Sequence, residues 1–484
     1  MAFLLIAFAD ALAWKRYGFK YKCMSRLLIV MTFLSLSSFS FGQITGDWFG
    51  TLQVQGVQLR MVLHISESEE GLVTTLDSPD QGAFGLAVEK TAFADPKLSL
   101  ELTNLRAQFE GQLKQDSLLG FWLQAGRQFP LHFGRKAKEV AKLKRPQEPS
   151  LPFPYQVEEV IFENPGANLQ LAGTLTLPKG IEKPPVAILI SGSGPQDRDE
   201  SIAGHKPFLV LADHLTRHGI AVLRYDDRGT AKSTGNHATA TTADFATDVE
   251  SAMQYLRSRP DIDSNKMGLI GHSEGGIIAP IVAARSKDVA FMVLLASTGV
   301  SGKELSLMQA QSLRTFDVPD EEAFMAFNER AIDLAASDEE LEVIRTQLTQ
   351  HYNSVRSVMA SMMPEGSDLD AFIGQQVSQM TSPWSRFFYN YNPADELEKV
   401  KDCPVLSLNG TKDLQVLANV NQSEIKKALE KAENKDVTIV KIENLNHLFQ
   451  ECETGAMSEY GQIEQTFSPK ALTIISDWIQ SKTQ

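Results

Sequence analysis

The sequence is poor in cysteine and lacks the residue spacings that hold metal ions. Only Cys23, Cys403 and Cys452 occur among its 484 residues, and no two of them form a C-x-x-C pair. A structural zinc ion needs four closely placed cysteine or histidine ligands, so we expect no metal site.

Positive charge and long apolar runs are also scarce. The 46 lysines and arginines are outnumbered by 60 aspartates and glutamates, and the formal net charge is -14. A nucleic-acid partner needs a basic face, so this class of function is excluded. No apolar run reaches the roughly 20 residues that span a bilayer, and we expect no membrane span in the mature protein. The length predicts two or three folded units.

The N-terminal 42 residues have the pattern of a secretory signal peptide. Five lysines and arginines precede the apolar run 27–41, which contains several serines and is followed by Gly42. The predicted cleavage lies between Gly42 and Gln43, and a start at Met24 would give a more ordinary signal. An uncleaved membrane anchor is the alternative. We expect a secreted or periplasmic protein.

Residues 43–135 predict a small β-rich, lipocalin-like domain. Short alternating runs recur and are separated by polar or glycine-containing segments, as in antiparallel strands with one wet face. The expected strands are 48–55, 58–65, 98–102, 108–113 and 118–123. Residues 136–154, in which lysines lead into regularly spaced prolines, predict a stiff, exposed linker.

Residues 155–484 predict a doubly wound, mostly parallel α/β sheet. Nearly continuous apolar runs suit strands that are buried on both faces, and helical stretches such as 242–258 lie between them. These runs are 186–190, 220–225, 266–270, 291–296, 405–408 and 437–442. Residues 300–395 break the alternation with helical periodicity and many methionines, and predict a helical lid.

The chemistry is concentrated where one of these strands meets a helix. Gly271-His272-Ser273-Glu274-Gly275 follows the run 266–270 and precedes a helical segment. This is G-x-S-x-G in the strand–turn–helix context of a nucleophile elbow, which predicts Ser273 as the nucleophile. A glycine-rich turn with a surface serine is the competing interpretation.

The later strands supply an acid and a base in the chain order that this fold requires. Asp413 follows the run 405–408, and His447 follows the run 437–442. His447 would accept the Ser273 proton, and Asp413 would hold the imidazole tautomer. Taken singly, a turn aspartate and a loop histidine would be unremarkable.

An oxyanion hole needs two backbone N–H donors. We assign one to Glu274, directly after the nucleophile, and one to Ser193, in the loop Ser-Gly-Ser-Gly after the run 186–190. An ordinary glycine-rich loop is the competing interpretation of the second segment.

With these motifs, residues 155–484 resemble bacterial α/β-hydrolases of the serine aminopeptidase-like group, in particular secreted esterases of the EstD type. The resemblance assigns the family's catalytic roles to Ser273, Asp413 and His447. It departs from the family at Ala231, where glycine is usual. The matching stretches are SGSGPQDR at 191–198, YDDRGTAKS at 225–233, GHSEGG at 271–276, NGTKDLQV at 409–416 and NHLFQ at 446–450.

We therefore predict a carboxylic-ester hydrolase that forms an acyl-enzyme, needs no cofactor and acts on small to medium apolar acyl esters. A serine peptidase of the aminopeptidase type is one alternative, and a non-enzymatic envelope ligand-binding protein is another. Arg228, among aspartates on two loops, is interpreted as a structural link rather than a substrate-carboxylate site. Cys403 and Cys452 are expected at opposite edges of the sheet, too far apart for a disulfide.

Overall fold

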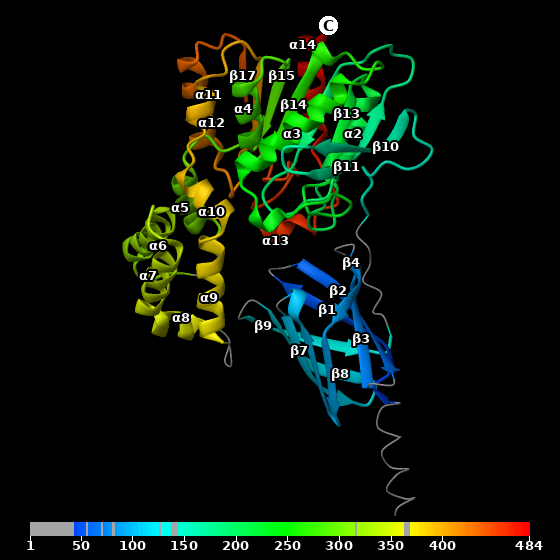
Figure 1. Cartoon of the computed structure of the whole chain (residues 1–484), viewed down its shortest axis with the longest axis vertical. Helices are drawn as coiled ribbons and strands as arrows, with labels where there is room; N and C mark the ends of the chain where they lie inside the picture. The colour runs from blue at the N-terminus through cyan, green and yellow to red at the C-terminus, as the bar shows by residue number, and fades with distance from the viewer. Residues whose placement is uncertain are drawn as a thin grey trace, which may run out of the picture. The chain divides into compact units, whose positions relative to one another are not determined.

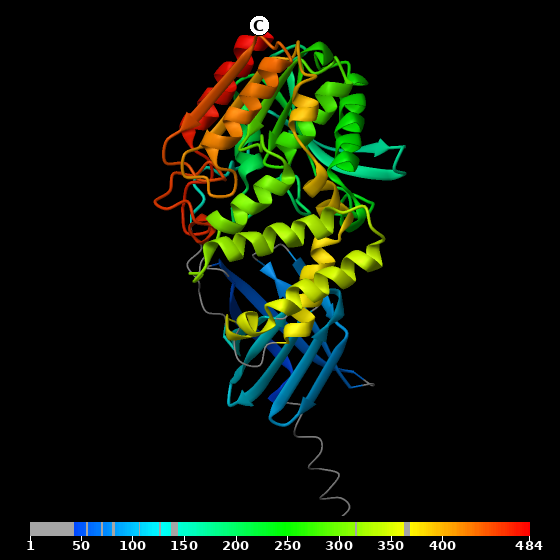
Figure 2. The same cartoon turned by 90° about the vertical axis from the view of Figure 1, so that its left-hand side faces the viewer.

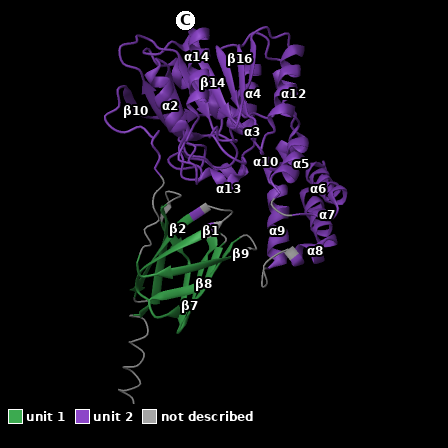
Figure 3. Cartoon of the chain, turned by 180° about the vertical axis from the view of Figure 1, so that it is seen from behind, with its two compact units in different colours: residues 1–52, 59–124, 129–138 green, residues 53–58, 125–128, 139–484 purple. Residues whose placement is uncertain are grey.

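The structure is a computed structural model that divides into two compact units (Figure 3). It describes residues 43–54, 57–68, 71–79, 83–105, 107–124, 127–136, 144–314, 317–362 and 368–484. The predicted signal peptide lies outside the described residues. The first unit comprises strands before residue 139, and the second contains the α/β sheet with its insertion.

The first unit is an antiparallel, up-and-down sheet. Its strand order is β4-β3-β2-β1-β9-β8-β7-β6-β5, and β3 also approaches β5. Burial alternates along the strands, as in β7, so one face packs inward. The inward face is filled by large side chains that include Trp48, Phe109, Trp122 and Phe133. The strands are β1 (Gly46–Val54), β2 (Val57–Ser68), β3 (Gly71–Ser78), β4 (Ala83–Val88), β5 (Lys90–Ala94), β6 (Lys97–Leu102), β7 (Ala107–Lys114), β8 (Ser117–Gln124) and β9 (Arg127–Gly134).

Sequence analysis missed β3, β4, β5 and β9. In β3 the buried positions are Thr74, Leu76 and Ser78, so polar side chains interrupt the apolar alternation. In β9, Pro130 argues against a strand because proline cannot donate to a ladder. Pairing with neighbouring strands overrides both local signals.

The second unit contains an eight-stranded sheet of order β10-β11-β13-β12-β14-β15-β16-β17. Only β11 runs against the others, because it pairs antiparallel with both β10 and β13. All six predicted apolar runs form strands here, which confirms the mostly parallel α/β sheet. The strands are β10 (Gln156–Asn164), β11 (Leu169–Leu177), β12 (Val186–Ile190), β13 (Ala221–Tyr225), β14 (Met267–His272), β15 (Phe291–Leu295), β16 (Val405–Gly410) and β17 (Val437–Ile442).

Helices cover both faces of this sheet (Figures 1 and 2). One face carries α2 (Pro207–Arg217) and α14 (Pro469–Thr483), which pack on each other. The other carries α3 (Thr242–Arg257), α4 (Gly275–Arg285) and α12 (Ala418–Lys431). Each face has its own apolar core, so the parallel strands are buried on both sides.

The insertion between β15 and β16 is helical. Helices α6, α7 and α9 pack around a small core of their own, which includes Leu334, Ile344 and Ile373. Helices α5 and α10 connect this group to the sheet (Figure 1). The helices are α5 (Gly302–Ser312), α6 (Glu321–Ala336), α7 (Leu341–Ser354), α8 (Arg356–Met362), α9 (Leu369–Met380), α10 (Pro383–Asn390) and α11 (Ala394–Leu397).

The described C-terminal part of the predicted linker makes specific contacts with the second unit. Arg145 donates to the carbonyls of Gly204, Gly461 and Ile463, at 3.0, 3.0 and 2.7 Å. The Gln147 side chain accepts from the Phe467 N–H and donates to its carbonyl. Arg145 and Gln147 thus hold residues 145–147 against loops of the second unit. A lysine- and proline-rich pattern does not reveal such contacts, because it does not show which side chains will find backbone partners.

Two further expectations concern cysteines and membranes. Cys403 and Cys452 are both free, which confirms that no disulfide joins them. Among the described residues, no helix has the length and apolarity needed to cross a membrane.

Candidate active site

Ser273 lies in a sharp turn between β14 and α4. Its φ is 52°, in the left-handed region that non-glycine residues rarely adopt. Glycines flank the turn because a Cβ at Gly271 would lie 2.0 Å from the Gly275 carbonyl oxygen. A Cβ at Gly275 would lie 2.1 Å from the Ile190 carbonyl oxygen. This is the geometry of a nucleophile elbow, as the sequence pattern predicts.

Ser273 is partly exposed, whereas residues 271, 272, 274 and 275 are buried. The turn therefore leaves Ser273 accessible, although its neighbours in sequence are buried. The loop after β12 comes close to it, since a Cβ at Gly192 would lie 3.3 Å from Ser273 Cβ.

Asp413 and His447 lie side by side, as expected from their positions after β16 and β17. His447 Nδ1 lies 2.8 Å from Asp413 Oδ2, and both side chains are at most 5% exposed. The other carboxylate oxygen, Oδ1, accepts from the backbone N–H groups of Gln415 and Val416 at 2.8 and 2.9 Å. The ionised carboxylate is therefore held in one orientation and can fix the His447 tautomer.

A tight turn supports the backbone of His447. The Asn446 side-chain oxygen accepts from the N–H groups of Leu448 and Gln450 at 3.0 Å. Gln450 in turn contacts buried His205 at 2.9 Å. Burial lowers the pKa of His205 to about 4, so this histidine is neutral. Sequence analysis matched Asn446 and Gln450 to the family pattern without assigning them this supporting role.

Of the two predicted oxyanion donors, Glu274 directly follows Ser273, and Ser193 follows Gly192 in the loop that approaches Ser273. The Gly192 N–H donates to Glu200 Oε1 at 2.8 Å. Within the described residues, the backbone N–H groups of Ser193 and Glu274 have no protein acceptor. Both could thus donate to a substrate oxygen, and their assignment stays a prediction.

The Glu274 side chain connects the elbow to the insertion, a contact that sequence analysis missed. Its Oε1 accepts from the Thr242 hydroxyl at 2.6 Å and from Trp384 Nε1 at 2.7 Å. Burial raises the pKa of the Glu274 carboxyl, and these two donors partly offset that effect. No local pattern indicates a bond that joins residues 110 positions apart.

His272 and Glu200 form a second contact that sequence analysis missed. The two side chains are 8% and 4% exposed, and His272 Nδ1 lies 2.8 Å from Glu200 Oε1. Burial opposes a charged imidazole, but the charge and hydrogen bond of Glu200 outweigh it and raise the pKa of His272. His272 was quoted only as the variable residue of G-x-S-x-G.

Arg228 has a structural setting. It forms a bidentate pair with buried Asp248 of α3, at 2.7 and 2.8 Å. Of the aspartates on the two loops, Asp226 binds Arg198 instead. Because protein groups bind the Arg228 guanidinium, its interpretation as a structural link agrees with the structure, and the partner lies on α3.

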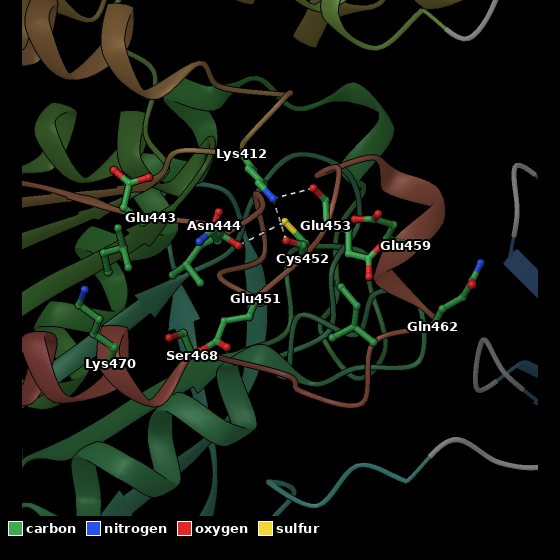
Figure 4. Close-up of a pocket in the computed structure, with 13 residues that line it drawn as sticks. Lys412, Glu443, Asn444, Glu451, Cys452, Glu453, Glu459, Gln462, Ser468 and Lys470 are labelled. Atoms are coloured by element: carbon green, nitrogen blue, oxygen red, sulfur yellow. Dashed lines mark hydrogen bonds between the residues drawn. The ribbon is translucent and has the colours of Figure 1, made fainter.

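An open cavity of about 910 Å³ lies beside the loops that carry Asp413 and His447 (Figure 4). Lys412 Nζ donates there to the carbonyls of Cys452 and Glu453 at 3.2 and 2.6 Å, and so joins the two loops. Ser273 and His447 do not line it, so we assign it no catalytic role. Its lining residues are Lys412, Ile442, Glu443, Asn444, Leu445, Glu451, Cys452, Glu453, Glu459, Gln462, Ile463, Ser468 and Lys470.

The family described as serine aminopeptidase, S33, matches residues 206–453, which is just over half of the chain. The chain belongs to this family. It is a serine hydrolase, and the matched segment includes the elbow at Ser273, Asp413 and His447. Ala231, where the resemblance leads us to expect glycine, occupies a left-handed conformation with a φ of 47°.

Individual relatives of this serine hydrolase include named esterases. Esterase EstD of Thermotoga maritima is 35% identical over 117 residues, which is 24% of this chain and 28% of that enzyme. An esterase of Pyrococcus furiosus aligns with 71% of this chain and 99% of its own, at 15% identity and a TM-score of 0.42. Est1E of Butyrivibrio proteoclasticus, solved with ferulic acid bound, aligns with 66% of this chain and 96% of its own, at 16% identity and a TM-score of 0.38.

Proposed function

We propose that this serine hydrolase cleaves carboxylic esters through an acyl-enzyme, with Ser273 as nucleophile, His447 as base and Asp413 as its acid partner. The observation that carries the proposal is the buried 2.8 Å contact between His447 Nδ1 and Asp413 Oδ2. With Nδ1–H donated to Asp413, the His447 Nε2 lone pair is free to accept a proton.

In the first half-reaction, Ser273 Oγ attacks the acyl carbonyl while its proton moves to His447 Nε2. The N–H groups of Ser193 and Glu274 donate to the oxyanion, and the alcohol leaves with the proton from His447. In the second, water gives its proton to His447 and attacks the acyl-serine. The carboxylic acid departs and Ser273 regains its proton, so one ester and one water yield one acid and one alcohol.

We expect the preferred acyl groups to be small to medium and apolar. The helical insertion supports this, because α10 contacts the residue after the nucleophile through Trp384. The end of α5 also contacts the acid loop, where the Ser312 hydroxyl donates to the Leu414 carbonyl at 2.6 Å. Unbranched methionines in such an insertion suit an adaptable apolar surface.

Aminopeptidase activity is the second candidate, and the family description favours it. Such an enzyme needs free carboxylates for the substrate's amine. Asp227 is close to the elbow, but its two oxygens accept from the Ser191 hydroxyl and the Gln196 N–H at 2.7 and 2.9 Å. Burial raises the pKa of Asp227 to about 8, so this carboxyl is a poor counter-ion for an amine. We therefore rank the esterase first.

Labelling with a fluorophosphonate tests the nucleophile, and a substrate panel tests the reaction. We expect wild type to be labelled, and Ser273→Ala to lose labelling and at least about 10³-fold in kcat while remaining folded. Butyrate and hexanoate esters should have a higher kcat/KM than acetate or aminoacyl anilides. Activity retained in Ser273→Ala would refute the triad, and preference for anilides would make the peptidase the first candidate.

We also propose that the protein is secreted or periplasmic, on the strength of its basic and apolar N-terminal segment. Cell fractionation with N-terminal sequencing should find Gln43 first. Full-length protein in the cytoplasm would contradict this location.

A further inference from the structure

His272 bridges two loops of the candidate site through both nitrogens of its ring. Nδ1 lies 2.8 Å from Glu200 Oε1, and Nε2 lies 3.0 Å from the backbone carbonyl oxygen of His447. The rings of His272 and His447 are 4.8 Å apart between centroids. His272 therefore connects the strand that ends at Ser273 with the loop that carries His447.

Proton counting identifies the form of this ring. The His447 carbonyl oxygen can only accept, so His272 Nε2 donates to it. Glu200 Oε1 already accepts the Gly192 N–H at 2.8 Å, and an oxygen that accepts there also accepts from His272 Nδ1, so both ring nitrogens donate. The arrangement is that of an imidazolium paired with a carboxylate, buried and neutral as a pair.

Glu200 is held in a conformation that costs free energy. Its φ is 51°, and left-handed conformations cost a non-glycine residue on the order of 1–3 kcal/mol. A turn stabilises it, in which the Glu200 N–H donates to the Asp197 carbonyl at 2.9 Å. A strained residue of this kind persists where contacts with the surrounding structure hold it in place. Here it brings the carboxylate inward to Gly192 and His272.

We propose that Glu200 and His272 form a buried ion pair that positions three parts of the catalytic machinery at once. The carboxylate fixes the oxyanion loop through the Gly192 N–H. The imidazolium fixes the backbone of His447 and, through the chain, the residue next to it, Ser273. Both are positioning residues, and the inference rests on the proposed function of Ser273 and His447.

The charges around the pair fit this role. Asp413 is held by His447 and two backbone N–H groups, which leaves Glu200 as the direct carboxylate partner of His272. Nearby Asp227 is occupied by Ser191 and Gln196. Charge-assisted hydrogen bonds are shorter and roughly twice as strong as neutral ones, so an ion pair positions loops better than a neutral contact does.

Nuclear magnetic resonance of the full-length wild-type protein tests the charge state directly. We expect His272 to show two slowly exchanging ring N–H signals at pH 7.5, identified by their loss in His272→Gln. An exposed histidine, with an ordinary pKa near 6.5, is neutral and shows one exchanging N–H at this pH. A single ring N–H on His272 would overturn the ion pair, whatever the variants do.

Kinetics of three variants test the positioning role. Glu200→Gln and His272→Gln should lower kcat by about 10- to 100-fold with little change in KM, because small misplacements of reacting groups have losses of this size. His272→Asn keeps a donor near the Nδ1 position and loses the one to His447. This variant should keep the Glu200 contact that orients the oxyanion loop, but its kcat should fall as in His272→Gln. Glu182 and His218 are exposed, so Glu182→Gln and His218→Gln serve as controls matched to Glu200→Gln and His272→Gln.

The outcomes separate this inference from the proposed function. Failure of fluorophosphonate to label Ser273 in wild type would refute the proposed function, while the ring N–H signals would still decide the ion pair. If wild type is labelled and the folded variants keep wild-type kcat, the positioning role is wrong. A loss confined to KM would also overturn it.

Discussion

At the scale of single residues, strained backbone occurs at the Ser273 turn and at Glu200. Their φ values are 52° and 51°. Each such residue costs on the order of 1–3 kcal/mol, and the cost is tolerated where side-chain position matters. At Ser273 the strain lifts the side chain out of a buried turn, and at Glu200 it directs a carboxylate inward.

Asp413→Asn should abolish most activity without unfolding the protein. Because the backbone N–H groups of Gln415 and Val416 require an oxygen at Oδ1, the new amide would turn its NH₂ toward His447 Nδ1. His447 would then accept at Nδ1 and carry its proton on Nε2, where it cannot take the Ser273 proton. We expect kcat to fall by about 10⁴-fold, the size seen for this change in another triad enzyme.

The matched control is Glu443→Gln, since Glu443 is exposed and, within the described part of the chain, its side chain accepts a single hydrogen bond, from the Thr411 hydroxyl at 3.2 Å. Its kcat should stay near wild type. Near-normal turnover in Asp413→Asn together with loss in Glu443→Gln would show that the acid partner was assigned to the wrong residue.

At the scale of elements, α10 is the part of the insertion that contacts the catalytic turn. Trp384 stacks on Phe388 with ring centroids 4.9 Å apart, and its Nε1 donates to Glu274. Glu274 also follows the nucleophile, so its side chain influences the orientation of its own backbone N–H. The position of α10 is therefore coupled to a proposed oxyanion donor.

Trp384→Phe should keep the stacking and remove the donor. A buried acceptor that loses one of its two donors costs about 1–3 kcal/mol, so the free energy of unfolding should fall by that amount. Removal of the donor also favours the protonated form of Glu274. We expect kcat to fall as well, because Glu274 also carries a proposed oxyanion N–H. Urea unfolding and ester kinetics measure the two effects.

Trp478→Phe on α14 is the control, because its Nε1 donates only to the Thr438 hydroxyl, at 3.2 Å. It should leave kcat unchanged. If Trp384→Phe also leaves kcat unchanged, α10 plays no part in the geometry of the turn.

At the scale of the whole molecule, residues 145–147 contact one loop 59 positions away in sequence and others more than 300 positions away. Arg145 contacts the loops at 204 and 461–463, and Gln147 contacts 466–467. The loop at 466 touches His205 through Thr466, at 2.9 Å, and His205 contacts Gln450. The segment before β10 is therefore part of the framework around the His447 loop.

Arg145→Ala should lower the free energy of unfolding of the full chain by about 1–3 kcal/mol, since three carbonyls, two of them in part-buried contacts, lose a charged donor. Urea unfolding followed by intrinsic fluorescence measures this. Arg257→Ala provides the comparison, because its ion pair with Asp288 is exposed, and such pairs are worth about 0–1 kcal/mol. Equal effects of the two substitutions would mean that residues 145–147 lie loosely on the surface.

Local sequence patterns were enough to predict the mostly parallel α/β sheet, the segments that form its parallel strands and the turn at Ser273. These follow from short-range patterns: apolar runs with helices between them, and glycines where a Cβ would meet backbone. It also placed Asp413 and His447 after neighbouring strands, because parallel strands end at one edge of a sheet. The β10–β11 hairpin had a turn signal at 165–168 that sequence analysis overlooked.

Only the tertiary structure decided the contacts between distant side chains. The bonds from Glu200 to His272, from Trp384 to Glu274 and from Arg145 to the 461–463 loop each join segments far apart in sequence. Their residues carry no local periodicity that marks them, since a glutamate or arginine in a loop usually faces solvent. Folding buries these groups, and a buried charge or donor must find a partner. The partners are therefore set by which loops the sheet brings together.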